Sequence, residues 1–117
     1  MSVSLDTYRK IVLAFPEVTE EQHFGYTAFK ISKKVFATLN PPENRGCFKL
    51  SSEDQSIFCS FGPAIYPVPE RWAKFGWTNV SLPDVKEEIL AEALKAAFCE
   101  VAPKRLSKLF AYNGEEL

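Results

Sequence analysis

The chain has 117 residues, of which 46% are hydrophobic and 25% are charged, and its formal net charge is −1. This length and composition are typical of one soluble globular domain over residues 1–117, with residues 111–117 as a candidate flexible tail. The net charge excludes the strongly basic class of proteins that bind nucleic acid indiscriminately, although a local basic face can still attract a polyanion.

The N-terminal stretch "MSVSLDTYRK" lacks the apolar core of a signal peptide, and the longest apolar runs are much shorter than a membrane span. The three cysteines, Cys47, Cys59 and Cys99, are odd in number and form no C-x-x-C motif. Such cysteines are typical of reduced thiols in a cytosolic protein. We therefore expect a cytoplasmic monomer that has no membrane partner.

The first part of the chain predicts a helix and then a β-hairpin. Residues 4–15 place apolar side chains at helical spacing and offer Ser4 as an N-cap. Residues 27–31 alternate between apolar and polar side chains, and residues 35–39 form a second strand-like run after a connection of only three residues. This pattern predicts two antiparallel strands joined by a tight turn.

The rest of the chain predicts two more strands and three more helices. The stretch "CFKLS" from Cys47 predicts a strand, and a capping box at residues 52–55 opens a short helix. A Pro-rich loop over residues 63–74 leads to a strand over residues 75–82. A long helix follows, with Asp84 and Glu87 as its capping box, and a last short helix has Pro103 in its first turn. Short hairpin connections without β-α-β alternation predict an α+β fold, a two-layer domain with an antiparallel sheet and helices packed on one face.

The two tryptophans lie in the Pro-rich loop and in the strand that follows it. In this strand Val80 and Leu82 share the core face, so Trp77 lies on the opposite, more polar face. An exposed Trp77 is a platform on which a base can stack. The alternative is that a loop or the last helix covers it. Trp72 is expected to pin the Pro-rich loop to the body of the domain.

Basic side chains gather at predicted turns and helix ends. Lys33 and Lys34 occupy the tip of the predicted hairpin, and Lys30 projects from the polar side of the strand before it. Lys104 and Arg105 lie in the first turn of the last helix, where a cation opposes the helix dipole. Phosphate contact is the functional interpretation of these charges. Ordinary surface lysines that protect strand edges are the alternative.

Recognisable catalytic and cofactor-binding motifs are absent from the sequence. One histidine and three scattered cysteines make no metal-ligand set. Acidic residues at Glu17, Glu20 and Glu21 surround His23, so a carboxylate–histidine pair is a candidate general base. A solvated acidic loop after the first helix is the alternative interpretation, and the one we favour. We therefore expect a protein that is not an enzyme and that has no cofactor and no metal.

The stretches "HFGYTAFKI", "KKVFATL", "CFKLS", "YPVPERW", "GWTNVSL" and "APKRL" together resemble the MmcQ/YjbR family, whose members are described as DNA-binding. The resemblance implies a compact α+β fold of the CyaY-like kind, with a double-wing arrangement. It implies no catalytic residues, because the family has no agreed set of them. Its recurrent positions correspond here to His23, Phe24, Gly25, Phe29, Lys34, Phe36, Lys49, Trp72, Gly76, Trp77, Lys104 and Arg105.

Two positions depart from the family pattern. Thr27 stands where a proline is common in the family, and Lys33 stands where a glycine is common in the hairpin. Lys33 makes the hairpin tip more basic, but a lysine adopts the backbone conformations of a tight turn less easily than glycine does. The CyaY-like fold also implies iron binding through an acidic first helix. Only Asp6 precedes Glu17 in this region, so we do not transfer iron binding to this chain.

Two function classes follow from these observations. The first is weak, salt-dependent DNA binding, with the candidate contact residues Lys30, Lys33, Lys34, Trp77, Lys104 and Arg105. The second is a protein-interaction or small-ligand module, in which the aromatic, Pro-rich segment 63–77 forms a groove and His23, Trp72 and Trp77 are the candidate lining residues. An enzyme that uses His23 with a carboxylate or a cysteine ranks third.

Overall fold

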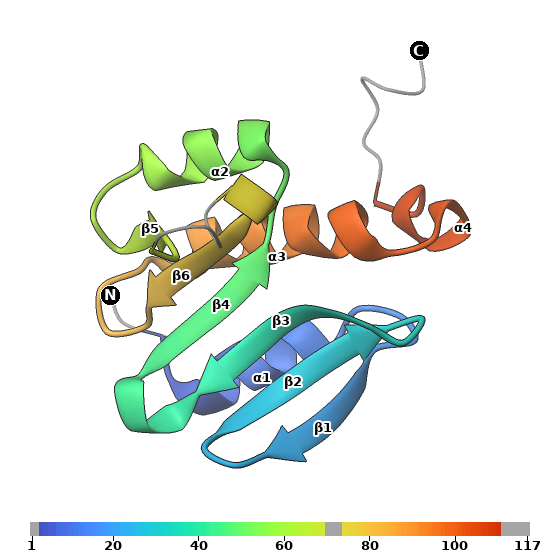
Figure 1. The fold of residues 1–117 in the computed structure, drawn as a ribbon, viewed down its shortest axis with the longest axis horizontal. Helices are drawn as coiled ribbons and strands as arrows, with labels where there is room; N and C mark the ends of the chain where they lie inside the picture. Colours follow the sequence, from blue (N-terminus) through green and yellow to red (C-terminus); the bar gives the residue numbers. More distant parts are fainter. Residues whose placement is uncertain (1–2, 70–73, 111–117) are drawn as a thin grey trace.

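A computed structural model describes residues 3–69 and 74–110, and all structural statements below concern these residues. The elements are α1 (Leu5–Leu13), β1 (Thr19–His23), β2 (Tyr26–Ile31), β3 (Lys34–Asn40), the short 3-10 helix η1 (Pro41–Glu43), β4 (Arg45–Lys49), α2 (Ser52–Cys59), β5 (Ile65–Pro67), β6 (Trp77–Ser81), α3 (Glu87–Val101) and α4 (Lys104–Ser107). The strands form one antiparallel sheet in the order β1-β2-β3-β4-β6-β5 (Figure 1). The predicted α+β class is confirmed.

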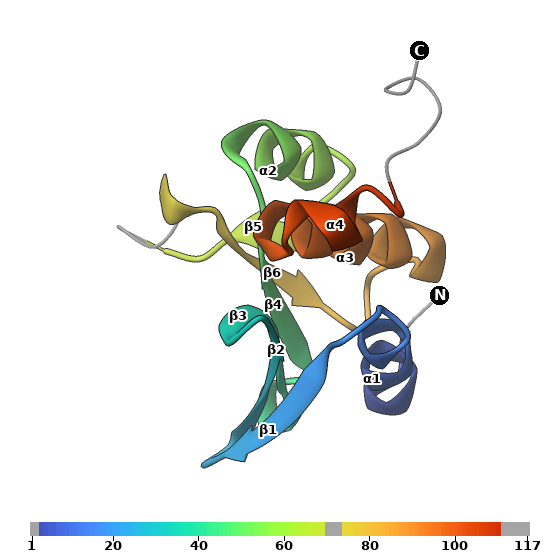
Figure 2. The same cartoon turned by 90° about the vertical axis from the view of Figure 1, so that its right-hand side faces the viewer.

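The helices and the sheet form two layers. Figure 2 shows α1, α3 and α4 on one side of the sheet. The remaining helix, α2, contacts β5 and α3. No described helix covers the opposite side. We call that side the open face, and it carries Lys30, Thr38, Cys47, Trp77 and Asn79 because these residues alternate with core residues along their strands.

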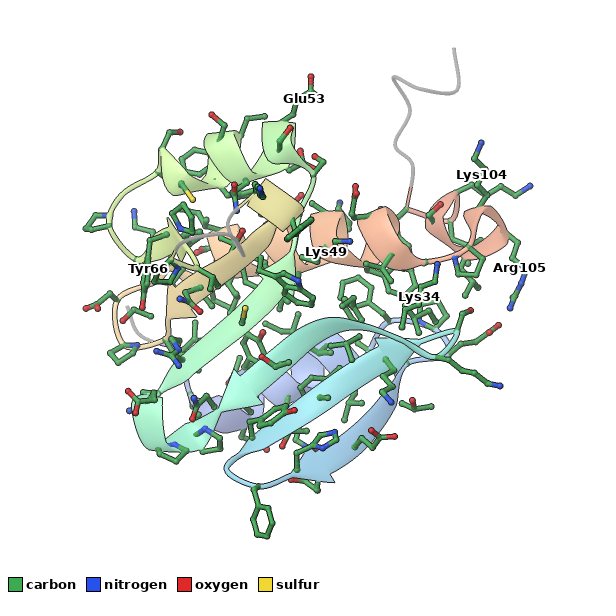
Figure 3. All side chains as sticks on the ribbon, viewed as in Figure 1. Lys34, Lys49, Glu53, Tyr66, Lys104 and Arg105 are labelled. Carbon is green, nitrogen blue, oxygen red and sulfur yellow. The ribbon has the colours of Figure 1, made fainter. Side chains whose placement is uncertain are left out.

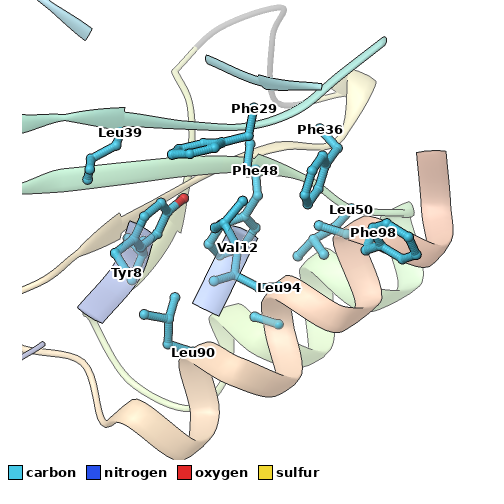
Figure 4. Close-up of a cluster of buried hydrophobic side chains, with 14 of the residues drawn as sticks. Tyr8, Val12, Phe29, Phe36, Leu39, Phe48, Leu50, Leu90, Leu94 and Phe98 are labelled. Atoms are coloured by element: carbon cyan, nitrogen blue, oxygen red, sulfur yellow. The ribbon is translucent and has the colours of Figure 1, made fainter. Parts of the chain in front are cut away.

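The core lies between the sheet and the helices α1 and α3. Figure 4 shows Tyr8 and Val12 of α1 and Leu90, Leu94 and Phe98 of α3 facing the strand residues Phe29, Phe36, Leu39 and Phe48, all of them buried. Complete burial of one such side chain contributes about 1.5–3 kcal/mol. This continuous apolar layer fixes the sheet on the helices and so gives the open face a rigid support.

Tyr8 sets how closely α1 approaches the sheet. Burial raises the pKa of the Tyr8 hydroxyl well above its ordinary value, and this hydroxyl donates a hydrogen bond of 2.9 Å to the carbonyl oxygen of Thr38. The ring lies directly over Gly46, where a Cβ atom would overlap it. The close contact between α1 and β4 therefore requires glycine at position 46.

Four phenylalanines hold one end of the molecule together. The ring of Phe15, which follows α1, is stacked on Phe98 at 4.9 Å between centroids and meets Phe110 edge-on at 5.4 Å. Phe36 of β3 meets Phe98 at 5.7 Å. Such aromatic pairs contribute about 0.5–1.5 kcal/mol each beyond their buried area. This phenylalanine cluster fixes the start of β3 relative to α3 and to the residues that follow α4.

Two strands were missed by the sequence pattern. The expected acidic loop after the first helix contains β1, which pairs with β2 along its whole length. Its residues are polar on both faces, so the strand carries no hydrophobic alternation and depends on β2 for its hydrogen bonds. The predicted loop over residues 63–74 contains β5, a three-residue edge strand held by β6.

The starts of three helices also differ from the prediction. The N-cap of α2 is Ser51, whose Oγ accepts a hydrogen bond from the backbone N–H of Asp54, and not Ser52. Asp84 does not cap α3, because its carboxylate accepts a 2.6 Å hydrogen bond from the Ser81 hydroxyl instead. Pro103 is the N-cap of α4 and does not lie in its first turn.

Candidate functional site

The tip of the β2–β3 hairpin presents two unpaired cations. Ser32 and Lys33 both have positive φ angles, 52° and 69°, the backbone geometry of a type I′ turn. Lys33 and Lys34 are exposed, and neither forms an ion pair with a described residue. The tight turn therefore holds two positive charges beyond the edge of the core.

The short helix α4 presents the other predicted pair of cations. Lys104 is exposed and forms no ion pair within the described part of the chain. Arg105 instead forms two parallel hydrogen bonds to Glu17, at 2.8 and 2.9 Å. These bonds lower the pKa of the Glu17 carboxyl below its ordinary value. The charge of Arg105 is therefore compensated inside the protein, whereas that of Lys104 is not.

The hairpin tip and α4 lie at the same end of the molecule. Figure 3 shows Lys34, Lys104 and Arg105 at this end, and Figures 1 and 2 both place the hairpin tip and α4 there. The phenylalanine cluster is the cause, because Phe36 follows Lys34 in β3 while Phe110 follows α4. We call Lys33, Lys34, Lys104 and Arg105 the basic end.

The predictions for the basic end overlooked Lys108. It lies one turn after Lys104, is exposed, and forms no ion pair among the described residues. The i, i+4 spacing of the two lysines was the available signal, because residues four apart share one side of a helix.

Lys30, whose partner in the sheet is Val35 beside Lys34, belongs to a cluster with Glu21 and His23 on the open face and is not an unpaired cation. The Lys30 ammonium is 3.0 Å from the Glu21 carboxylate, which also lies 3.1 Å from His23 Nε2. The hydrogen bond from Lys30 is the largest cause that lowers the pKa of Glu21. The His23 ring is stacked on Tyr26, with 4.9 Å between centroids.

This geometry gives His23 one carboxylate partner, which it shares with a lysine. Glu17 and Glu20, the other acidic residues near it in sequence, bind Arg105 and Arg9 instead. The expected acidic surroundings of His23 are thus divided among three cations.

Trp77 is half-buried and lies on the open face, so α4, which packs on the helical side of the sheet, does not cover it. Its carbonyl oxygen accepts hydrogen bonds from the Val68 backbone N–H and the Gln55 side chain. Its neighbour across the sheet is Lys49 of β4. Trp77 therefore lies beside Lys49, and β4 and β3 separate it from β2. Trp72 lies outside the described residues.

The open face contains a groove of about 600 Å³. Its lining residues are Phe24, Gly25, Tyr26, Thr38, Asn40, Pro42, Glu43, Arg45, Gly46, Cys47, Val68, Pro69 and Asn79. Val68 and Pro69 belong to the Pro-rich segment that was expected to form a groove, but the expected lining residues His23 and Trp77 are not among these. Arg45 and Asn79, which do line it, were not among the predicted pocket residues.

Cys47 lies in the floor of this groove and is mostly buried. Burial is the main cause that raises its pKa from 9.0 to about 11. The thiol is therefore protonated at neutral pH, whereas a nucleophilic cysteine requires the thiolate. This environment does not favour covalent catalysis at Cys47.

Residues 3–69 and 74–110 contain no group of three or more His, Cys, Asp and Glu side chains that could hold a metal ion. Within the same residues, no helix has the length and apolar character that crossing a membrane requires.

Comparison with known proteins identifies the family. The chain is similar to the crystal structure of Deinococcus radiodurans protein DR2400, which has a DUF419 domain, with a TM-score of 0.72 and 23% identity over 92% of this chain and 88% of that chain. At this identity the likeness shows a shared fold alone. No curated protein matches the chain. The model of the YjbR family matches residues 13–100, which is well over half of the sequence. The chain therefore belongs to the YjbR family.

Proposed function

We propose that this protein is a non-enzymatic, cytoplasmic nucleic-acid-binding protein that contacts phosphates through its basic end. The observation that carries the proposal is that Lys34, its neighbour Lys33 at the hairpin tip, and Lys104 lie at one end of the molecule without a carboxylate partner among the described residues. Three unpaired ammonium groups on two neighbouring elements match the phosphate contacts that position a protein on nucleic acid.

The rigidity of this end supports the proposal. The type I′ turn fixes Lys33 and Lys34, and the phenylalanine cluster fixes the start of β3 relative to α4. Lysines held on rigid elements lose less freedom on binding than lysines on mobile loops. The basic end therefore favours contact with the regular spacing of a phosphate backbone.

Arg105 and Lys30 contact phosphate only after the phosphate replaces their carboxylate partners. Arg105 is bound to Glu17 and Lys30 to Glu21, and both pairs are at least partly exposed. Exposed ion pairs contribute little, so a phosphate competes readily with the carboxylate. In this proposal Arg105 joins the lysines when phosphate displaces Glu17, and Lys30 makes a peripheral contact.

Trp77 has a separate role in the proposal. Its half-buried ring lies beside Lys49 on the open face, which pairs an aromatic surface with a cation. That combination suits an unpaired base and its phosphate. Duplex contact at the basic end and base stacking at Trp77 are therefore separable activities.

The overall net charge of −1 limits the affinity. With about three phosphate contacts, the binding constant for duplex DNA falls roughly 40-fold between about 50 and 200 mM salt. Binding is thus expected to be weak at physiological ionic strength and detectable at low salt.

Titration of labelled duplex and single-stranded DNA at low salt, followed by fluorescence anisotropy, tests the proposal. The double variant Lys33→Ala/Lys34→Ala is expected to weaken binding about tenfold or more. Lys10→Ala is the matched control, because Lys10 is an exposed lysine that pairs with Asp6 on α1. No binding by the wild type at high micromolar protein, or an equal loss in the Lys10→Ala variant, would overturn the proposal.

A further inference from the structure

The register of the sheet aligns three polar residues in the floor of the open-face groove. Thr38 of β3 pairs with Cys47 of β4, and Cys47 pairs with Asn79 of β6. All three line the groove. Because residues in register share one face of a sheet, their side chains form a continuous row across three neighbouring strands.

Asn79 is the unusual member of this row. Asn79 is only 8% exposed and lines the groove, and its side chain makes no hydrogen bond with a described residue. No fully buried side-chain nitrogen or oxygen atom in the described residues lacks a hydrogen-bond partner, so the Asn79 carboxamide is accessible from the groove. A carboxamide has two donor hydrogens and an acceptor oxygen, so Asn79 offers both functions to a molecule in the groove.

Arg45 brings a positive charge to the same groove. It pairs with Ser81 across β4 and β6, two residues along from the Cys47–Asn79 pair. Diagonal neighbours of this kind lie about 7–8 Å apart, within the reach of a long side chain. The guanidinium of Arg45 forms no ion pair with a described residue. Arg45 and Asn79 therefore offer a cation and a neutral hydrogen-bonding edge at a fixed separation.

Glu43 limits the charge that the groove accepts. It is an exposed residue of η1 and lines the groove together with Arg45. One carboxylate and one guanidinium leave little net positive charge, so the groove favours a ligand with a single phosphate over a polyphosphate.

The walls of the groove suit a flat ring. Tyr26, which is 41% exposed and backed by the stacked His23 ring, lines one wall with the fully exposed Phe24. Val68 and Pro69 line the other wall. Small-molecule sites commonly combine apolar walls with a few polar groups, in volumes that include the 600 Å³ of this groove.

We propose that this groove binds a nucleoside monophosphate, that is, a flat heterocycle joined to a single phosphate. The ring lies between the two apolar walls, the Asn79 carboxamide bonds its polar edge, and Arg45 binds the phosphate. Asparagine is well suited to such an edge because it donates to one ring position and accepts from the next.

This site is separate from the basic end. Asn40 lines the groove and Lys34 belongs to the basic end, and these residues are the two ends of β3. At about 3.4 Å per residue they lie roughly 20 Å apart. The monophosphate site and the proposed nucleic-acid function can therefore fail independently.

Amide NMR spectra of the isotope-labelled protein test this proposal. The probes are adenosine, guanosine, cytidine and uridine monophosphate, each compared with inorganic phosphate and with the matching triphosphate. At least one monophosphate is expected to shift the Asn79 side-chain amide and the Arg45 backbone amide, and to bind more tightly than its triphosphate. A trinucleotide is a further probe, since its terminal nucleotide also carries a base and a phosphate. It shows whether the end of a nucleic-acid strand occupies the same groove.

Variants assign the contacts. Arg45→Ala and Asn79→Ala are each expected to weaken monophosphate binding about tenfold. If Asn79→Ala does not fold, the Arg45→Ala variant still tests the site, because Arg45 is only half-buried. Lys86→Ala, an exposed lysine outside the groove, and Lys33→Ala/Lys34→Ala are expected to bind as the wild type does. No shift at millimolar monophosphate, shifts confined to the basic end, or equal affinity for inorganic phosphate would overturn the proposal.

Discussion

Arg105 of α4 and Glu17, 88 residues earlier in the chain, form a bidentate ion pair with distances of 2.8 and 2.9 Å. The pair joins α4 to the connection between α1 and β1. It also places a carboxylate inside the basic end, where it competes with any phosphate for the guanidinium. The strength of nucleic-acid binding is therefore expected to depend on Glu17.

Glu17→Gln is expected to increase the affinity for DNA by several-fold at low salt, because Arg105 then becomes available to a phosphate. Anisotropy titration with labelled duplex DNA measures the change. Glu20→Gln is the matched control, since it removes the same charge but releases Arg9 instead of Arg105. Equal effects of the two substitutions would mean that only net charge matters and that Arg105 makes no phosphate contact.

The stability of the protein is expected to fall in acid. Ion pairs with Arg105, Arg9 and Lys30 lower the pKa values of Glu17, Glu20 and Glu21 from their ordinary value of 4.5. A carboxyl group with a lowered pKa in the folded state stabilises the protein above its unfolded-state pKa. That contribution is lost as the pH falls through the lowered value.

Thermal unfolding measured across the range below about pH 4.5 checks this dependence. The Glu20→Gln variant is expected to lose less stability than the wild type over this range, because it has one fewer carboxyl group with a lowered pKa to protonate. A wild-type midpoint that stays constant throughout this range would contradict the assigned ion pairs.

Lys33→Gly is expected to stabilise the protein and to weaken DNA binding. Lys33 has a φ of 69°, in the left-handed region that costs an ordinary residue about 1–2 kcal/mol and glycine almost nothing. The greater freedom of glycine in the unfolded chain offsets part of this gain, so a net increase of about 0.5–1 kcal/mol is expected.

Denaturant unfolding measures the change, with Lys34→Gly as the control. Lys34 is the first residue of β3 and has no positive φ, so glycine there is expected to destabilise the protein. If both variants were destabilised alike, the hairpin tip would not have the turn described here.

Gly46→Ala is expected to destabilise the protein by about 1–3 kcal/mol, because the added methyl group overlaps the Tyr8 ring and forces α1 away from β4. Calorimetry or denaturant unfolding measures this loss. The double variant Gly46→Ala/Tyr8→Leu checks the cause, since a smaller side chain at position 8 makes room for the methyl group. The two substitutions are expected to cost less together than the sum of their separate costs, and simple additivity would contradict the contact.

The elements with regular periodicity could be predicted from the sequence. The apolar stripe of α3 and the hairpin of β2 and β3 lie close to their predicted positions. β1 could not be predicted, because its sequence TEEQH has no apolar face and only pairing with β2 makes it a strand. β5 is three residues long and contains Pro67, so its local pattern indicates a loop.

The candidate sites divide in the same way. The cations of the basic end are visible in the sequence, but the pairing of Arg105 with Glu17 is set by the packing of α4 beside the α1–β1 connection. The groove depends on the register of β4 with β6, which brings Arg45 and Asn79 together from distant parts of the chain. No local motif encodes such a register.

The salt dependence of duplex DNA binding tests the proposed function most directly. If Lys33, Lys34 and Lys104 each contact a phosphate, the logarithm of the binding constant is expected to fall against the logarithm of salt concentration with a slope of about −2.7. The triple alanine variant is expected to lose most of this slope and to keep only the part that Arg105 contributes, while Lys10→Ala keeps the whole slope. A slope near zero in the wild type, or an unchanged slope in the triple variant, would contradict the proposal.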